Sequence, residues 1–295
     1  KDQRPLLVIT HPFYHVYHAS ALLALGDVVA IHCFDEENQD SQGRSKKLSL
    51  SDGIDGLTMD EKNRLAAVVV CTPDNPTGRC LTLTEMEHLF DRTRRHEALL
   101  ISDECYSDLD HGVPPISFLN HANNGFGLER IIISNSLSKR SGAPGLRVGL
   151  LISDPAIITE LATWRAHLSA IPSRALLTIA TALWNDDRHV ALNRQKYQQR
   201  LAIAADILGD SPSFQSPEAG FFLWLRFHNG ITACRDIFAA TGIKLLPGVF
   251  MGGGADDGPA LPYGRLAMIL PEQPNDSQQP SWRQLCAQLK PFLLP

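Results

Sequence analysis

The ten residues Arg-Ile-Ile-Ile-Ser-Asn-Ser-Leu-Ser-Lys, at positions 130–139, join a strand pattern to a reactive side chain. Three consecutive isoleucines are β-branched and favour a strand over residues 130–136. Such apolar runs are typical of parallel strands that are covered on both faces. In open α/β sheets, ligands bind beyond the carboxyl ends of the strands. The stretch therefore predicts both a fold class and a place for chemistry, at Lys139.

Five further short runs have a similar strand pattern, and helical patterns lie between them. The clearest helical pattern covers residues 82–97 and begins with the capping box Thr82-Leu83-Thr84-Glu85. This alternation predicts an α/β sheet with helices on both sides. The five other expected strands are residues 6–10, 27–33, 66–72, 98–103 and 147–153.

After residue 153 the pattern changes, and helices come first. We expect a large sheet domain over residues 1–170, and a long connecting helix with a smaller α+β domain over 171–295. Residues 35–57 and 252–259 are expected to be loops. The expected elements of this second part are helices 155–168, 173–184 and 187–208, strand 220–227, helix 232–241, strand 261–270 and helix 281–293.

Composition limits the kinds of function that the chain can have. Its net charge of -5 and the lack of a strongly basic stretch argue against nucleic-acid binding. No apolar run reaches the roughly 18 residues of a membrane span. The 6 cysteines show no CxxC spacing, which argues against a zinc site and suits a reducing cytoplasm. His11, His15 and His18 are interpreted as surface or entry-loop residues, so no metal site is expected.

Three other predicted strands also end in polar motifs. Asn-Pro-Thr-Gly at 75–78 follows one strand, Asp-Glu-Cys-Tyr at 103–106 follows another, and Pro-Phe-Tyr at 12–14 follows the first. Taken alone, these features have structural explanations: Asn-Pro-Thr-Gly is also a plain turn, Asp103 could cap a helix, and Lys139 could be a surface lysine. Their occurrence together at strand ends favours a shared ligand site.

In this order the motifs resemble those of fold-type I aminotransferases, which use pyridoxal phosphate (PLP). Gly-Leu-Arg at 145–147 and Gly-Arg-Leu at 264–266 fit the same pattern. The string Ser-Leu-Ser-Lys-Arg-Ser-Gly-Ala-Pro-Gly-Leu-Arg at 136–147 is similar to the branch of N-succinyldiaminopimelate aminotransferases, which typically have Asn in place of Gly142. The resemblance implies the fold-type I architecture, with a mostly parallel sheet of the seven-stranded type in the large domain.

The resemblance implies catalytic roles at the cofactor ring. Lys139 would hold PLP as a Schiff base and carry the proton between the substrate Cα and the cofactor. Asp103 would keep the pyridine nitrogen protonated. Tyr106 and Asn75 would bind the phenolate oxygen from two sides, and Tyr14 would stack on the ring face.

The resemblance also implies anion-binding roles. Ser136, Ser138 and Arg147 would bind the PLP phosphate, the arginine through a planar fork. Arg265, assisted by Asn75, would grip the substrate α-carboxylate. An unpaired arginine in such an apolar strand would otherwise be costly. Three aromatic residues of the preceding strand are interpreted as core: Phe221, Phe222 and Trp224.

The resemblance has gaps. Family members have an N-terminal arm, an early helix, a Gly-Thr/Ser loop at the PLP phosphate and a tyrosine given to the partner subunit. We find no match to these parts in the 295 residues. The chain is thus a fragment of a longer enzyme, a protein with a disordered start, or a degenerate homologue. Because every catalytic position of the matched part is present, we favour the first two.

Several functions are compatible with these residues. The leading hypothesis is a cytoplasmic, homodimeric aminotransferase of lysine biosynthesis. It would act on N-succinyl-LL-2,6-diaminopimelate with glutamate and 2-oxoglutarate as the second pair of substrates. N-acetylornithine is a close competitor, and aspartate-type or alanine-type enzymes are alternatives. A PLP-dependent C–S β-lyase would use almost the same residues. A PLP-binding regulatory domain without turnover is a third possibility.

Overall fold

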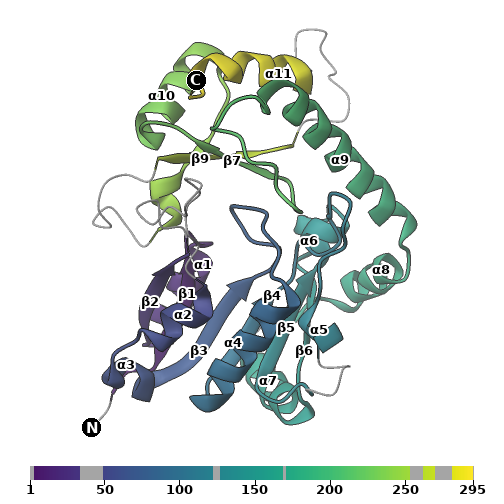
Figure 1. The fold of residues 1–295 in the computed structure, drawn as a ribbon. Helices are drawn as coiled ribbons and strands as arrows, with labels where there is room; N and C mark the ends of the chain where they lie inside the picture. The colour runs from purple at the N-terminus through teal and green to yellow at the C-terminus, as the bar shows by residue number, and fades with distance from the viewer. Residues whose placement is uncertain are drawn as a thin grey trace.

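The computed structural model describes residues 3–33, 49–121, 127–168, 171–252, 262–269 and 281–294. Its described strands form two sheets (Figure 1). The larger sheet has the order β2-β1-β3-β4-β5-β6, in which all neighbours are parallel except β5 and β6. Its strands are β1 (Leu6–His11), β2 (Asp27–His32), β3 (Leu65–Cys71), β4 (Leu99–Asp103), β5 (Ile131–Ser136) and β6 (Gly149–Ile152).

The predicted α/β class is confirmed, and each of these strands lies within two residues of its expected bounds. The family pattern implied a sheet of the seven-stranded type, whereas the described residues supply 6 strands. The helices of this part are α1 (Val16–Leu23), α2 (Leu50–Asp55), α3 (Met59–Arg64), α4 (Leu83–Arg95), α5 (Phe118–His121), α6 (Leu137–Arg140) and α7 (Pro155–His167).

Helix α4 shows why the sequence folds in this way. Thr82 and Glu85 form the predicted capping box: each side chain binds the other's backbone N–H at the first turn. Met86, Leu89 and Phe90 recur at helical spacing and are buried in one cluster with residues of β1, β3, β4 and β5. The apolar stripe of the helix therefore covers one face of the sheet.

The loop predicted over residues 35–57 is wrong in its last part, because residues 50–55 form α2. Ser49 Oγ accepts a hydrogen bond from the Asp52 N–H at 3.1 Å, and Leu50 and Ile54 are buried one helical turn apart. Residues 34–48, and most of the second predicted loop, lie outside the described residues.

A groove of about 390 Å³ lies between α1 and a face of the larger sheet. Its walls are mostly apolar, with contributions from Leu7, Val69 and Ile101. Two polar side chains of neighbouring strand ends, Asp103 and Ser134, also line it. The groove therefore leads along the sheet to the strand end where the predicted site begins.

The smaller sheet has the antiparallel order β7-β9-β8, with strands β7 (Phe222–Arg226), β8 (Leu246–Pro247) and β9 (Tyr263–Ala267). The long α9 runs from the larger sheet to the smaller one along one side of the molecule (Figure 1). The remaining helices are α8 (Arg174–Trp184), α9 (Arg188–Leu208), α10 (Gly230–Thr241) and α11 (Trp282–Leu289), with 3-10 turns η2 (Pro144–Leu146), η3 (Gly248–Met251) and η4 (Lys290–Phe292).

The core of the smaller sheet continues into the larger one. Leu223, Leu266 and Trp282 are buried in the same cluster as Tyr106 and Cys71, which follow or end strands of the larger sheet. The predicted domain boundary after residue 170 stays a prediction, because residues 169 and 170 lie outside the described residues. The two sheets meet at the strand ends that carry the motifs.

Candidate active site

Lys139 lies in the short helix α6, directly after β5. Ser136 caps this helix by accepting a hydrogen bond from the Ser138 N–H at 3.1 Å. Asn193 of α9 donates to the Lys139 carbonyl oxygen at 3.1 Å, which fixes the backbone from the connecting helix. The Lys139 Nζ lies 5.7 Å from the ring centroid of Tyr106 and 5.2 Å from that of Phe221. The amine thus sits between two aromatic side chains.

Asp103 ends β4, beside Ser134 of β5 in the strand register. Its Oδ2 accepts a hydrogen bond of 2.6 Å from the Tyr17 hydroxyl, and its Oδ1 accepts one of 3.2 Å from the Cys105 N–H. Burial, and then the neighbouring Cys71 and Asp103, raise the pKa of Tyr17 well above its usual range. Tyr17 therefore stays protonated and donates to the carboxylate.

Tyr17 is a site residue that the sequence interpretation missed. The signal was present, because Tyr17 lies five residues after Pro12, at the start of α1. Its ring also makes an edge contact with Tyr14, with centroids 5.8 Å apart. Tyr14, predicted to stack on the PLP ring, is 37% exposed, and this contact connects it to Asp103 through Tyr17.

Arg265 of β9 in the smaller sheet and Asn75 in the turn after β3 of the larger sheet meet directly. Arg265 Nη1 donates to Asn75 Oδ1 at 2.7 Å. Asn75 is 4% exposed, and Arg265 Cζ lies 4.2 Å from the Phe222 ring centroid. Burial lowers the pKa of Arg265, although the phenols of Tyr106 and Tyr14 act in the opposite direction. The structure therefore brings the predicted carboxylate-binding pair together.

The turn that carries Asn75 is held against residues 217–219, which precede the smaller sheet. Gly78 has a φ of +70°, and a Cβ there would lie 2.4 Å from Pro217 Cβ and 2.6 Å from the Ala219 oxygen. The Gly78 carbonyl oxygen accepts hydrogen bonds from the N–H groups of Glu218 (3.1 Å) and Ala219 (3.0 Å). Only glycine fits this close approach, which explains the residue type at this position.

The three predicted phosphate-binding residues are only partly joined. Ser136 Oγ donates to Ser138 Oγ at 2.9 Å, so these two hydroxyls lie together at the start of α6. Arg147 is exposed in a left-handed conformation, and its Nη1 donates to the Pro144 oxygen at 3.0 Å. Among the described residues, no hydrogen bond or ion pair joins Arg147 to either serine.

Arg140 is a further residue that the sequence did not single out. It is 7% exposed and bonds Asp108, which follows the Tyr106 turn, at 2.7 Å and Asp187, before α9, at 2.5 Å. Its guanidinium carbon lies 5.2 Å from the Trp184 ring centroid. Arg140 therefore ties the Lys139 helix both to the Tyr106 turn and to the connecting helix.

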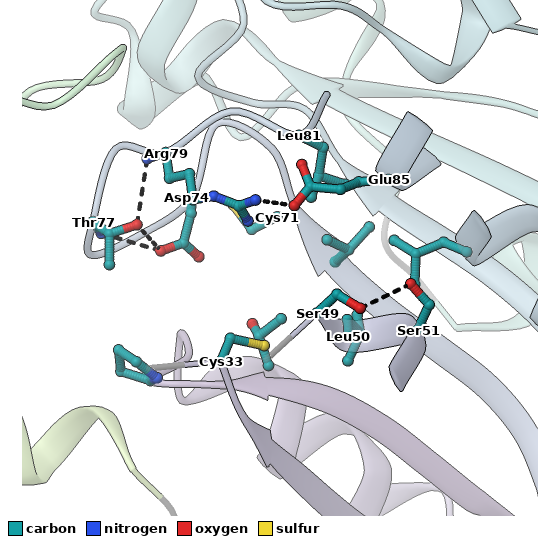
Figure 2. A pocket seen from close by; sticks show the side chains of 14 residues that line it. Cys33, Ser49, Leu50, Ser51, Cys71, Asp74, Thr77, Arg79, Leu81 and Glu85 are labelled. Atoms are coloured by element: carbon teal, nitrogen blue, oxygen red, sulfur yellow. Dashed lines mark hydrogen bonds and ion pairs between the residues drawn. The ribbon is translucent and has the colours of Figure 1, made fainter. Parts of the chain in front are cut away.

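A second cavity lies beside the Asn75 turn, toward β1 and β2 (Figure 2). Its polar side chains satisfy one another: Thr77 Oγ donates to Asp74 Oδ2 at 2.6 Å, and Arg79 pairs with Glu85. Neither Lys139, Asp103 nor Arg265 lines it. This cavity is therefore the weaker candidate for catalysis.

The histidine interpretation needs one correction. His11 is 3% exposed rather than at the surface, and its ring lies 4.1 Å from that of His32, because it ends the buried strand β1. The part of the chain that the structure describes has no group of three or more His, Cys, Asp or Glu side chains that could hold a metal ion. Within the same residues, no helix is both long and apolar enough to cross a membrane.

Comparison with known proteins finds several aminotransferases among the relatives of this chain. In Streptomyces rimosus, 4-dedimethylamino-4-oxo-anhydrotetracycline transaminase is 33% identical over 204 residues, which are 68% of this chain and 55% of that protein. LL-diaminopimelate aminotransferase of Dehalococcoides mccartyi is 24% identical, over 92% of this chain and 67% of that protein. A crystal structure of an aminotransferase from Neisseria meningitidis matches with a TM-score of 0.83 and 26% identity, over 98% of this chain and 69% of that one.

The chain spans about half the length of several curated relatives that it matches. The family model of aminotransferase class I and II matches residues 3–250. This range includes the end of β4 with Asp103 and the end of β5 with Lys139 after it. The chain therefore belongs to the aminotransferase class I and II family.

Proposed function

We propose that this protein is a PLP-dependent aminotransferase that moves an amino group between an amino acid and a 2-oxo acid. The single observation that carries the proposal is that three groups lie around Tyr106, where the two sheets join. These are the Lys139 amine, the Asp103 carboxylate on the neighbouring strand end, and the Arg265 guanidinium bonded to Asn75 at 2.7 Å. Its family depends on PLP.

The residues present fit this cofactor. When bound, PLP supplies an electron-withdrawing ring that stabilises negative charge at the substrate α-carbon. The Asp103 carboxylate, held by Tyr17 and the Cys105 N–H, can keep a ring nitrogen protonated. Lys139 Nζ can bind the cofactor carbonyl and can accept and return the α-carbon proton. The hydroxyls of Ser136 and Ser138 are placed together to donate to phosphate oxygens.

The other end of the site can hold a carboxylate. Arg265 Nη1 donates a hydrogen bond to Asn75 Oδ1, and this bond orients the planar guanidinium of Arg265. The remaining N–H groups can bind the α-carboxylate of an amino acid as a charge-assisted pair. The Tyr106 hydroxyl stays protonated, because burial raises its pKa well above the usual range, and it can therefore donate to an oxygen of the cofactor ring.

The substrate beyond the α-carboxylate is a narrower proposal. The resemblance of residues 136–147 favours N-succinyl-LL-2,6-diaminopimelate with glutamate and 2-oxoglutarate. Two relatives that are named LL-diaminopimelate aminotransferases, at 24% and 26% identity, support an acid of this class. N-acetylornithine and aspartate remain the alternatives, since aspartate aminotransferases are also among the relatives.

We also propose that the active protein is a homodimer in the cytoplasm. Several large apolar side chains on α7, directly after it and on α8 are exposed in the single chain: Trp164 is 60% exposed, Leu168 69% and Ile179 49%. A second copy of the protein would cover such a surface. Light scattering tests this, because a mass equal to that of one chain at working concentration would rule out the dimer.

The experiment that tests the activity compares two lysines. Purified protein is mixed with PLP, reduced with borohydride and digested, and the labelled residue is identified by mass spectrometry. We expect the label on Lys139 and its loss in Lys139→Ala. Lys244→Ala is the matched control, because Lys244 Nζ also lies over an aromatic ring, that of Phe238, at 5.6 Å. A label that persists in Lys139→Ala would contradict the proposal.

Turnover then separates the remaining functions. Candidate amino donors are supplied with 2-oxoglutarate, and glutamate is measured. Glutamate formation that needs Lys139 supports an aminotransferase. Release of pyruvate and ammonia from cystathionine without glutamate formation would instead identify a C–S β-lyase. PLP attachment without either reaction would identify a binding protein.

A further inference from the structure

Two consecutive phenylalanines before and at the start of β7 each lie against one of the functional cations. The Lys139 Nζ is 5.2 Å from the ring centroid of Phe221, and Arg265 Cζ is 4.2 Å from that of Phe222. Both phenylalanines are buried, with exposures of 5% and 7%. These two rings therefore contact functional cations in addition to packing in the core of the small sheet.

The rings belong to one connected aromatic group. The centroids of Phe221 and Phe222 are 4.4 Å apart, and each lies within 5.9 Å of the Tyr106 centroid. Tyr197 of α9 stacks on Phe221 at 5.3 Å with an angle of 22° between the planes. Contacts from β7, α9 and the Tyr106 turn thus fix the positions of both rings.

Neither of the two cations has a carboxylate partner among the residues that the structure describes. Arg265 makes its side-chain hydrogen bond to the neutral amide of Asn75. Two other arginines are neutralised: the buried Arg140 pairs with Asp108, and the half-buried Arg79 pairs with Glu85. Lys139 and Arg265 differ from these in having aromatic faces as neighbours instead of acids.

An aromatic face and a carboxylate hold a cation in different ways. A carboxylate occupies the N–H donors and cancels the charge, so that a ligand anion must displace it. A ring attracts the cation through its π face and accepts no strong hydrogen bond. A guanidinium on a ring therefore keeps its in-plane N–H edges open. An amine attacks a carbonyl only after it has lost a proton, and a ring holds back that proton less strongly than a carboxylate would.

We propose that Phe221 and Phe222 are positioning residues that hold Lys139 and Arg265 ready for their ligands without neutralising them. The proposal deepens the proposed function and rests on it: Phe221 orients the amine that receives PLP, and Phe222 orients the guanidinium that receives the substrate carboxylate. Because each ring serves a different cation, its removal should affect one binding step and leave the other nearly unchanged.

The test uses two readouts on the whole protein, neither of which is turnover. The first is the rate at which PLP attaches covalently to Lys139, followed by visible absorbance and by borohydride labelling. The second is the dissociation constant of succinate, a carboxylate probe that cannot react, measured by calorimetry without PLP. Phe221→Leu and Phe222→Leu keep apolar bulk but remove the ring face, and Phe222→Tyr restores it.

A cation–π contact in a partly desolvated site corresponds to roughly a 3- to 30-fold change in an equilibrium or rate. We expect Phe222→Leu to weaken succinate binding by that factor and to leave the PLP attachment rate within about twofold. Phe221→Leu should change the PLP attachment rate by more than about twofold, because the Lys139 side chain loses the ring that orients it, and should leave succinate binding within about twofold. Phe222→Tyr should bind succinate close to the unaltered protein.

Two outcomes would overturn the positioning role. If each leucine variant changed both readouts equally while its urea midpoint fell, the rings would be structural. If neither readout changed, the rings would be irrelevant to both cations. Failure of the proposed function would give a different result, because the unaltered protein would then not attach PLP at Lys139. The comparison of succinate binding between Phe222→Leu and Phe222→Tyr would still test the role of Phe222 at Arg265.

Discussion

Replacing Arg140 by methionine tests how strongly one buried cation holds the Lys139 helix in place. Arg140 joins α6 to Asp108 at 2.7 Å and to Asp187 at 2.5 Å, with side-chain exposures of 8% for the arginine, 23% for Asp108 and 87% for Asp187. These exposures, rather than the two short distances, determine the expected energies. Methionine keeps much of the arginine's apolar length, so the change removes mainly charge and donors.

The expected loss of unfolding free energy in Arg140→Met is the sum of the contributions from its two carboxylate partners and from its buried Nε. The hydrogen bond to Asp108 is largely shielded from water and contributes about 1.5–3 kcal/mol to the free energy of unfolding. The bond to the exposed Asp187 contributes about 0–1 kcal/mol. Arg140 Nε is buried without a hydrogen-bond partner among the described residues, so its removal returns about 1 kcal/mol. We therefore expect Arg140→Met to lower the unfolding free energy by about 0.5–3 kcal/mol.

Urea unfolding followed by tryptophan fluorescence measures the loss. Asp108→Ala and Asp187→Ala are the matched controls, and the first should cost more than the second by at least about 0.5 kcal/mol. As the salt concentration rises, the difference in unfolding free energy from the unaltered protein should shrink only for the Asp187 variant, because salt screens exposed ion pairs. Equal costs for the two aspartate variants, or an Arg140→Met protein as stable as the unaltered one, would refute the reasoning.

Two further predictions concern groups beside the site. Tyr17→Phe removes the 2.6 Å hydrogen bond to the Asp103 carboxylate and should lower the unfolding free energy in urea by about 1.5–3 kcal/mol; an unchanged midpoint would show that water replaces the hydroxyl. Burial raises the pKa of Asp74 from 3.8 to about 6, so the folded state binds this proton more tightly than the unfolded chain does. The resulting stabilisation is present below the ordinary pKa and is lost as the pH rises through about 6. In urea experiments across that window, Asp74→Asn should gain stability relative to the unaltered protein as the pH rises, and a constant difference would contradict the assignment.

The sequence predicted the strands of the large sheet well because buried parallel strands are continuous apolar runs. Leu65–Cys71 is an example, with six of its seven residues buried. Since these strands are parallel, their carboxyl ends lie at one edge, and the motifs at positions 75 and 103 were expected there. Helix α2 was missed because its 6 residues offer only one turn of apolar spacing next to a polar stretch.

The part of the site that the sequence could not predict depends on contacts between distant segments. Tyr17 reaches Asp103 across 86 positions of the chain, and no local pattern encodes that hydrogen bond. Phe221 and Phe222 have the composition of a core strand, and they are indeed buried. Their contacts with Lys139 and Arg265 arise only when the small sheet packs on the ends of the large one.

The candidate site also lies where the two sheets are connected. A substitution there can change ligand binding and the free energy of unfolding at the same time. Tyr106 belongs to the core of the small sheet, Arg265 of β9 bonds Asn75, and the Phe13 N–H donates to the Met251 oxygen of η3 at 2.7 Å. A substitution that loosens the small-sheet core can therefore displace Arg265 from Asn75 without touching either residue. A loss of carboxylate binding identifies a site residue only when the unfolding free energy is unchanged. For this reason the aromatic variants are compared in two separate binding readouts, since a loosened contact between the sheets would impair both.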